Sequence, residues 1–242
     1  MPEDQGHIYG HLESFKFNHR RQGFYDYINF LKTSNAPIED LIMHPTAFMG
    51  HMSLNRLLTL SDLYRKVLDL AGHIADVGVY KGGSALLFAK LIKIFESESL
   101  TLCHGFDWFQ GQVNSDQDSN LTLNHGYKSD FHFLSEAVRL QNLDNILKIH
   151  NLDLRSQIDT FFDENPHIRF KLINMDCGKY EVVKACLASF WERLNPGGIM
   201  ILDQYSHEHA PGETIGVHEI LNNVQIKKIP NSWTPTAYIV KN

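Results

Sequence analysis

From residue 74 onward, short apolar runs alternate with amphipathic segments. The apolar runs predict strands, and segments with apolar residues three and four positions apart predict helices. Strands are predicted at 74–79, 100–106, 146–150, 170–175, 199–202, 225–229 and 237–240, and helices at 84–95, 131–140 and 180–194. This alternation predicts an α/β fold with a doubly wound, mostly parallel sheet, and the turn between the last two strands predicts an antiparallel edge hairpin.

The N-terminal third carries no strand signal and is predicted to be helical. A first helix, indicated by apolar residues at helical spacing, ends at the breaker Asn35-Ala36-Pro37. A second helix is expected from about Ser53, a plausible N-cap, to about residue 68. The segment 42–52 between them is either a mobile lid over an active site or a packed connector. We therefore predict an N-terminal helical arm or lid at 1–72 and a ligand-binding domain at 73–242.

The first predicted strand leads through a glycine-rich turn, DVGVYKGGS at residues 76–84, into a helix. Glycines let the backbone pass close to a ligand, and a helix N-terminus presents free N–H groups. The turn therefore predicts a nucleotide cradle that includes Gly78, Gly82, Gly83 and Ser84. Its glycine spacing differs from the G-x-G-x-x-G of dinucleotide-binding folds, which weakens the alternative of an NAD-dependent oxidoreductase.

Acidic residues lie at or just beyond four of the predicted strand ends, where such sheets bind their ligands. Asp107 follows the second strand and suits a ribose diol, because a carboxylate accepts hydrogen bonds from both hydroxyls. Asp153 follows the third strand and either accepts from an adenine amine or caps a helix. Asp176 and Asp203 follow the fourth and fifth strands. Trp108 either stacks on the adenine or the acceptor, or is a packing residue.

Composition excludes several classes of function. The net charge of −6 argues against general nucleic-acid binding, which rests on a basic surface. No apolar run approaches the roughly 20 residues that a membrane span needs, and the polar start of the chain lacks a signal-peptide core. The three cysteines have neither CxxC spacing nor an even framework, which favours a cytoplasmic protein.

Four stretches between Ile74 and Leu221 resemble one enzyme family. They read IADVGVYKGGSALLFAKL, HGFDWFQG, ENPHIRFKLINMDCGKYEVVKACLASFWERLNPGGIMILDQY and APGETIGVHEIL. The sequence resembles class I S-adenosylmethionine-dependent methyltransferases, and within them the macrocin O-methyltransferase family of sugar methylases. The resemblance implies a seven-stranded Rossmann-like methyltransferase sheet and S-adenosylmethionine (SAM) as the cofactor.

The resemblance also implies which residues form the SAM site. The implied set is Asp76, Gly78, Tyr80, Gly82, Ser84 and Asp107. Asp76 would either hydrogen-bond the amino-acid part of the cofactor or orient the turn. Gly82, Gly83 and the helix start at Ser84 would face the methionine carboxylate, since SAM has no pyrophosphate.

A divalent metal, usually Mg²⁺, is a further implication of the resemblance. Family members typically carry D-x-D-x-Y after the fourth strand and D-D/E after the fifth, where this chain has DCGKY at 176–180 and DQY at 203–205. The first acid of each pair is present, and Gly178 and Gln204 replace the second acids. Asp176, Asp203 and the amide oxygen of Gln204 are the remaining candidate metal ligands.

These features predict an O-methyltransferase that acts on a hydroxyl of a small sugar-like acceptor, such as a deoxysugar in a nucleotide sugar, a natural product or a polysaccharide. The hydroxyl must lose its proton, and the candidate bases are Asp176 and, without a metal, His207 or His209. Besides the oxidoreductase, the alternatives are a non-catalytic SAM-binding protein with a degenerate metal site and a related hydroxylase. The helical arm suggests a homodimer or higher homo-oligomer.

Overall fold

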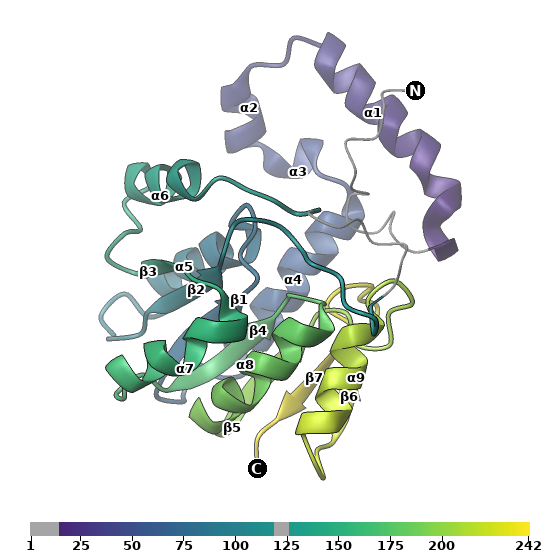
Figure 1. Ribbon diagram of the computed structural model, residues 1–242. Helices are drawn as coiled ribbons and strands as arrows, with labels where there is room; N and C mark the ends of the chain where they lie inside the picture. Colours follow the sequence, from purple (N-terminus) through teal and green to yellow (C-terminus); the bar gives the residue numbers. More distant parts are fainter. Residues whose placement is uncertain (1–14, 119–125) are drawn as a thin grey trace.

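The computed structural model describes residues 15–118 and 126–242, and a seven-stranded sheet forms its centre (Figure 1). The strands lie in the order β3-β2-β1-β4-β5-β7-β6. Neighbours from β3 to β5 are parallel, and β7 is antiparallel to both β5 and β6. The strands are β1 (His73–Val77), β2 (Cys103–Asp107), β3 (Leu147–Asn151), β4 (Phe170–Met175), β5 (Leu194–Leu202), β6 (Ile226–Lys228) and β7 (Ala237–Val240). The predicted doubly wound sheet with an antiparallel edge hairpin is confirmed.

Helices cover both faces of the sheet, because successive strand residues point to opposite sides. On β4, Leu172 joins the core under α4, α5 and α6, whereas Ile173 joins the core under α7, α8 and α9. Figure 1 shows α7, α8 and α9 in front of the sheet, with α4 and α5 behind it. The helices are α4 (His51–Arg65), α5 (Gly83–Phe95), α6 (Phe131–Leu140), α7 (Leu154–Glu164), α8 (Tyr180–Arg193) and α9 (Pro211–Ile220).

The N-terminal region begins with a 3₁₀-helix, η2 (Phe15–Arg20), followed by α1 (Arg21–Thr33), α2 (Ile38–Met43) and α3 (Pro45–Phe48). None of α1, α2 and α3 contains a buried residue, and Figure 1 shows them apart from the two helix layers. In contrast, α4 buries Leu60, Leu63 and Tyr64 in the same core as β1 and α5. The predicted arm therefore contains one helix that is packed into the body of the fold.

Three details differ from the sequence-based expectations. The helix predicted to begin with Ser53 as N-cap begins at His51, with Gly50 in the extended conformation before it. The segment 195–198 does not separate α8 from β5 but forms the irregular start of β5, where the pairing with β4 shifts register. Helix α9 was not predicted, and α7 was expected only as the helix that Asp153 would cap. Within the described ranges, no helix is long and apolar enough to cross a membrane.

Candidate active site

A cavity of about 160 Å³ opens at the carboxyl ends of β1 to β4. Seven of the residues predicted from the sequence lie on its wall, and they are Gly78, Tyr80, Asp107, Trp108, Asp153, Asp176 and Gln204. The wall thus joins the residues predicted for the cofactor to those predicted for the metal and the base. The cavity lies where parallel α/β sheets bind their ligands.

Asp107, at the end of β2, is held by backbone N–H groups. Its Oδ2 accepts from the backbone N–H of Tyr80 at 2.8 Å, and its Oδ1 accepts from that of Phe109 at 2.7 Å. Burial raises the pKa of Asp107, and these backbone hydrogen bonds oppose the shift. Tyr80 has a left-handed backbone with φ of 51°, a conformation that residues other than glycine rarely adopt outside functional turns. The turn therefore fixes the carboxylate, and each oxygen keeps a lone pair for a ligand.

Asp76 lies inside the fold rather than on the cavity wall. It is fully buried, accepts from Ser84 Oγ at 2.8 Å and from Asn174 Nδ2 at 2.7 Å, and its pKa is raised by burial to about 6. Since Ser84 is in the first turn of α5, Asp76 ties the end of β1 to that helix. The geometry fits the orienting role for Asp76. Gly82, Gly83 and Ser84 also lie off the cavity wall.

Gly78 has a structural reason to lack a side chain. Its φ is 94°, and a Cβ atom there would lie 2.0 Å from the carbonyl oxygen of Asp176. The ends of β1 and β4 can therefore approach each other only at a glycine. Gly82 also has a positive φ, of 88°, and a Cβ there would clash with Leu134 of α6.

Asp153 caps α7, which was the simpler of its two predicted roles. Its Oδ1 accepts from the backbone N–H of Arg155 at 3.0 Å, and its Oδ2 pairs with the Arg155 guanidinium at 2.7 Å. Hydrogen bonds from the Arg155 side chain lower the pKa of Asp153. The same guanidinium lies 4.5 Å from the centre of the Trp108 ring. The side chains of Arg155 and Trp108 both line the cavity. That Asp153 accepts a hydrogen bond from the adenine amine stays a prediction.

The long polar loop after β2 supplies part of the cavity wall through Gly111, Gln112, Val113 and Tyr127. Its two described parts meet where the backbone N–H of Gln112 donates to the carbonyl of Gly126 at 2.8 Å. Asp118 is buried and its Oδ1 accepts from the backbone N–H of Tyr180 at the start of α8. The loop is therefore part of the candidate site, and residues 119–125 lie outside the described ranges.

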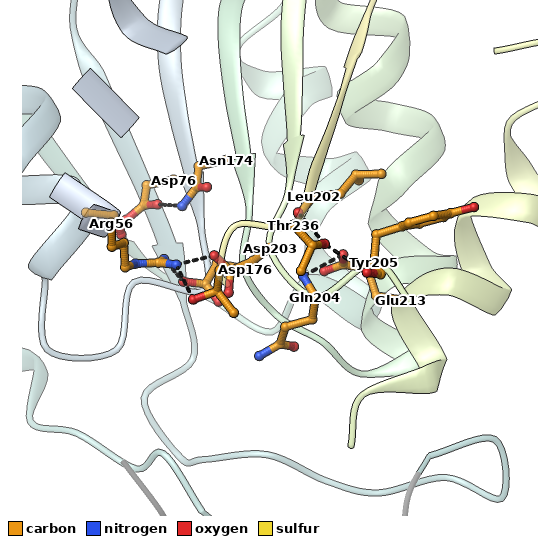
Figure 2. A network of polar contacts seen from close by, with 12 residues as sticks. Arg56, Asp76, Asn174, Asp176, Leu202, Asp203, Gln204, Tyr205, Glu213 and Thr236 are labelled. Carbon is orange, nitrogen blue, oxygen red and sulfur yellow. Dashed lines mark hydrogen bonds and ion pairs between the residues drawn. The ribbon is translucent and has the colours of Figure 1, made fainter. Parts of the chain in front are cut away.

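Asp176 and Asp203 share a cation that was not predicted from the sequence (Figure 2). Arg56, from the first turns of α4, donates through Nη2 to Asp176 Oδ2 at 2.7 Å and through Nη1 to Asp203 Oδ1. Nη1 also lies 3.1 Å from Thr234 Oγ1. Burial lowers the pKa of Arg56, but the two carboxylates outweigh it and the net shift is upward. Burial and the charge of Asp203 raise the pKa of Asp176, against the effect of Arg56.

The residues around this cation do not form a good donor set for a divalent metal. A Cβ atom at Gly178 would lie 1.9 Å from Gln204 Oε1, so the amide fills the space where a second acid would begin. In Figure 2 no contact joins the Gln204 amide to either carboxylate. Among the residues in the described ranges, no three His, Cys, Asp or Glu side chains form a possible metal site. The predicted magnesium site therefore reduces to two carboxylates that are already bridged by Arg56.

His207 and His209, the alternative candidate bases, lie between β5 and α9. Both are buried, and His207 Nδ1 accepts from the backbone N–H of His209 at 3.1 Å. Burial lowers the pKa of each imidazole. The His207 ring packs 5.1 Å from that of Trp233, and neither histidine lines the cavity. Asp176 is the only one of the three candidate bases on the cavity wall.

Comparisons with known proteins agree with this geometry. Residues 75–205, more than half of the chain, match the family model described as "Methyltransferase domain". The chain belongs to this methyltransferase family. The matched range begins in β1 and ends just after Asp203, so it contains the glycine turn and all four strand-end acids.

The proteins similar to this methyltransferase include an enzyme in calicheamicin biosynthesis. It is 22% identical over 184 residues to the mycinamicin III 3''-O-methyltransferase of Micromonospora griseorubida, covering 73% of this chain and 71% of that protein. The crystal structure of the calicheamicin methyltransferase CalS11 superposes with a TM-score of 0.81 at 25% identity, covering 94% of this chain and 93% of that one. The O-methyltransferase NovP shares the fold, with a TM-score of 0.66 at 18% identity, over 77% of this chain and 79% of that chain.

Arg56 is the main site residue of this methyltransferase that the sequence analysis missed. It lies outside the stretches that carry the family resemblance. A signal was nevertheless present, because Arg56 is four residues before Leu60 and eight before Tyr64, on the apolar stripe of its helix. A charged residue on the core-facing side of a helix requires a buried partner.

Proposed function

We propose that this protein transfers the methyl group of SAM to a hydroxyl group of a sugar. The observation that carries the proposal is that one cavity joins Asp107, held as a ribose-binding carboxylate, to Asp176 at the end of β4. Two relatives support the sugar acceptor by their names, the mycinamicin III 3''-O-methyltransferase and CalS11, described as a TDP-rhamnose 3'-O-methyltransferase. The acceptor class that follows is a deoxyhexose, either in a nucleotide sugar or in a glycosylated natural product.

The cofactor end of the cavity has the groups that SAM requires. With SAM bound, Asp107 would accept the two ribose hydroxyls, Trp108 and Leu152 would flank the adenine, and Asp153 would lie near its amine; all four residues line the cavity. The turn at Gly78 and Tyr80, which also lines the cavity, would pass beside the methionine part. SAM supplies a methyl group on a positively charged sulfur, and the chain supplies orientation.

Asp176 is the proposed general base. The acceptor oxygen forms a bond to the methyl carbon, the carbon–sulfur bond breaks, and its electron pair stays on sulfur, which leaves neutral S-adenosylhomocysteine. The hydroxyl proton passes to Asp176. Its Oδ2 is bonded to Arg56, and its Oδ1 accepts no hydrogen bond from the residues that the structure describes. His207 and His209 remain predictions as alternative bases.

The helices α1 to α3 are proposed to cover the acceptor end of the cavity or to contact a second subunit. They expose large apolar side chains, namely Phe30, Ile38, Ile42 and Met43. A homo-oligomer, a division of the chain at residue 72 and a cytoplasmic location remain predictions.

Ligand binding and turnover test the proposal together. SAM is expected to raise the melting temperature, because a ligand that binds only the native state stabilises it. NAD is expected to have no such effect, and a rise with NAD would favour the oxidoreductase alternative. With SAM and a panel of deoxyhexosyl nucleotides that includes TDP-rhamnose, mass spectrometry is expected to detect S-adenosylhomocysteine and a methylated sugar. SAM binding without turnover on any sugar or glycoside would contradict the proposed acceptor class.

A further inference from the structure

Arg56 connects three segments that are far apart in the sequence. Its guanidinium contacts Asp176 after β4, Asp203 after β5 and Thr234 before β7. The Asp203 side chain is only 4% exposed, whereas the side chains of Arg56 and Asp176 are 25% and 24% exposed. The guanidinium therefore lies between Asp176, which lines the cavity, and the more deeply buried Asp203.

The guanidinium occupies the place that a bridging cation would take. It lies between the carboxylates of Asp176 and Asp203, and one nitrogen points to each (Figure 2). A planar guanidinium with several N–H groups suits this bridge, because it satisfies two acceptors at once and stays charged at any relevant pH. Two neighbouring carboxylates repel each other, so a positive charge between them stabilises the pair.

Gly178 and Gln204 replace the second acids that family members typically carry. Their geometry agrees with a guanidinium, rather than a metal ion, between the two carboxylates. Gly178 adopts a positive φ of 58°, which favours glycine over an acidic residue. Gln204 Oε1 is buried against Gly178 and has no hydrogen-bond partner among the described residues. Lys179, only 2% exposed, is the lysine of the DCGKY segment; it lines the same cavity and adds positive charge there. Arg56 bridges the two carboxylates and Lys179 lines the same cavity, so the positive charge at this end disfavours a divalent ion.

We propose that Arg56 is the resident cation of the acceptor site, and that this chain transfers the methyl group without a divalent metal ion. The inference rests on the proposed sugar O-methyltransferase function. Arg56 acts as a positioning residue, because it holds Asp176 and Asp203 as a carboxylate pair and directs the free oxygen of Asp176 to the acceptor. The side chain comes from α4, so the N-terminal helical region completes the site.

The first test uses the unaltered protein. EDTA is expected to leave kcat unchanged, and neither Mg²⁺ nor Mn²⁺ is expected to raise the melting temperature. Loss of turnover in EDTA that Mg²⁺ restores would overturn the inference. So would a Mn²⁺-induced rise in melting temperature that disappears in Asp203→Asn.

The second test removes the cation. Arg56→Ala is expected to lower kcat by about 10²–10³-fold, as for the loss of one oriented charged donor. Its affinity for SAM should stay within about twofold, because Arg56 is absent from the cavity wall that holds the cofactor groups. The two freed carboxylates should now bind Mn²⁺, seen as a melting-temperature rise that the unaltered protein lacks. Arg56→Lys keeps the charge and should retain more turnover than Arg56→Ala, without gaining Mn²⁺ binding.

Arg65→Ala is the matched control, since Arg65 is in the same helix and stacks on Phe95 at 4.9 Å, away from the site. It should change neither kcat nor the response to Mn²⁺. If Arg56→Ala does not fold, Arg56→Lys and the EDTA arm still decide the question. If no sugar is methylated under any condition, the proposed function fails, while the Mn²⁺ response of Arg56→Ala still tests the cation position. An Arg56→Ala protein that keeps full kcat would overturn the inference.

Discussion

Helix α4 takes part in two ion-pair networks, one at the amino ends of the parallel strands (the amino edge) and one at their carboxyl ends (the carboxyl edge). The two networks differ in how completely their charges are paired. At the amino edge, Tyr64 donates to Glu96 Oε1 at 2.5 Å, and Lys171 of β4 pairs with Glu96 Oε2 at 2.6 Å. At the carboxyl edge, Arg56 pairs with Asp176, the residue after β4, and with Asp203. The same helix and strand therefore hold one network at each end.

We call the network at the amino edge closed, because its negative charge is matched by one positive charge. We call the network at the carboxyl edge open, because its two carboxylates share one cation. Glu96 receives hydrogen bonds from Lys171, Tyr64 and Thr101, and these lower its pKa although burial acts to raise it. One negative charge meets one positive charge there, and Lys171 is fully buried. At the carboxyl edge two carboxylates share one guanidinium, and Asp176 keeps a partly exposed side chain. A closed pair contributes to the native structure, while an open pair leaves an oxygen for a substrate.

The largest expected effect is on turnover, at the open network. Asp176→Asn should lower kcat by about 10²–10⁴-fold, because the amide cannot accept the proton of the acceptor hydroxyl. The dissociation constant for SAM should stay within about twofold, since this variant keeps the shape of the cavity wall. Steady-state kinetics and calorimetry measure the two quantities. Full turnover in Asp176→Asn would remove this residue from the mechanism.

The next effect is on stability, at the closed network. Lys171→Met leaves Glu96 without its cation and should lower the free energy of unfolding by about 3 kcal/mol. Urea denaturation measures the loss, and kcat at a temperature where the variant is folded should match that of the unaltered protein. Lys90→Met, at an exposed position of α5, is the control and should change neither quantity. If Lys171→Met lowers kcat as much as Asp176→Asn does, the distinction between the two networks is wrong.

A smaller effect is expected at the cofactor end, where the carboxylate is held by backbone groups instead of a cation. Asp107→Ala removes the acceptor of the ribose hydroxyls and should weaken SAM binding by about 30–100-fold, or ~2–3 kcal/mol. Calorimetry measures the affinity, and circular dichroism checks that the fold is intact. Asp144→Ala, at an exposed position before β3, should bind SAM normally. Unchanged SAM affinity in Asp107→Ala would refute the cofactor assignment.

The contrast between the cofactor end and the acceptor end of the site also explains which of its residues could be predicted from the sequence. Asp107 and Tyr80 lie at the carboxyl ends of the neighbouring strands β2 and β1; the strand-end position predicted Asp107, and the family resemblance implied Tyr80. Arg56 reaches Asp176 across 120 residues and Asp203 across 147, and no local pattern fixes such a contact. The sheet was predictable because strand periodicity is local. The pairing of a helix residue with two strand ends depends on tertiary packing.

The ranges of two helices, α7 and α9, were not predicted, for separate physical reasons. In α9, Gly212 and Gly216 lower the intrinsic helix propensity. A Cβ atom at Gly216 would lie 2.7 Å from the Val183 side chain, so this glycine allows α9 to pack closely on α8. In α7, Ile158, Phe161 and Phe162 form a short apolar face within a polar segment. Tertiary contact outweighs propensity in α9, and the α7 pattern is too short to stand out.

The smallest expected effect is on the pH dependence of stability. It concerns two histidines, His104 and His150, that lie outside both ion-pair networks. His104 of β2 is 5% exposed, its Nδ1 lies 3.1 Å from His150 Nε2 of β3, and the two rings stack with centres 5.3 Å apart. Burial lowers the pKa of His104 to about 3 and that of His150 to about 4. Both imidazoles are therefore neutral in the native state near neutral pH, and the unfolded chain binds protons first as the pH falls.

Stability should therefore be complete above the unfolded histidine pKa of about 6.5 and fall as the pH drops toward the lowered native values. The expected loss between pH 7 and pH 5 is about 1–2 kcal/mol for each histidine, measured by urea denaturation at a series of pH values. His104→Gln should remove about half of that dependence, because it deletes one of the two depressed pKa values, whereas His132→Gln on the exposed face of α6 should leave the slope unchanged. Since turnover depends on the open network and not on these rings, kcat of His104→Gln at neutral pH should stay normal. A His104→Gln protein with an unchanged pH slope would show that the acid sensitivity arises at the ion-pair networks instead.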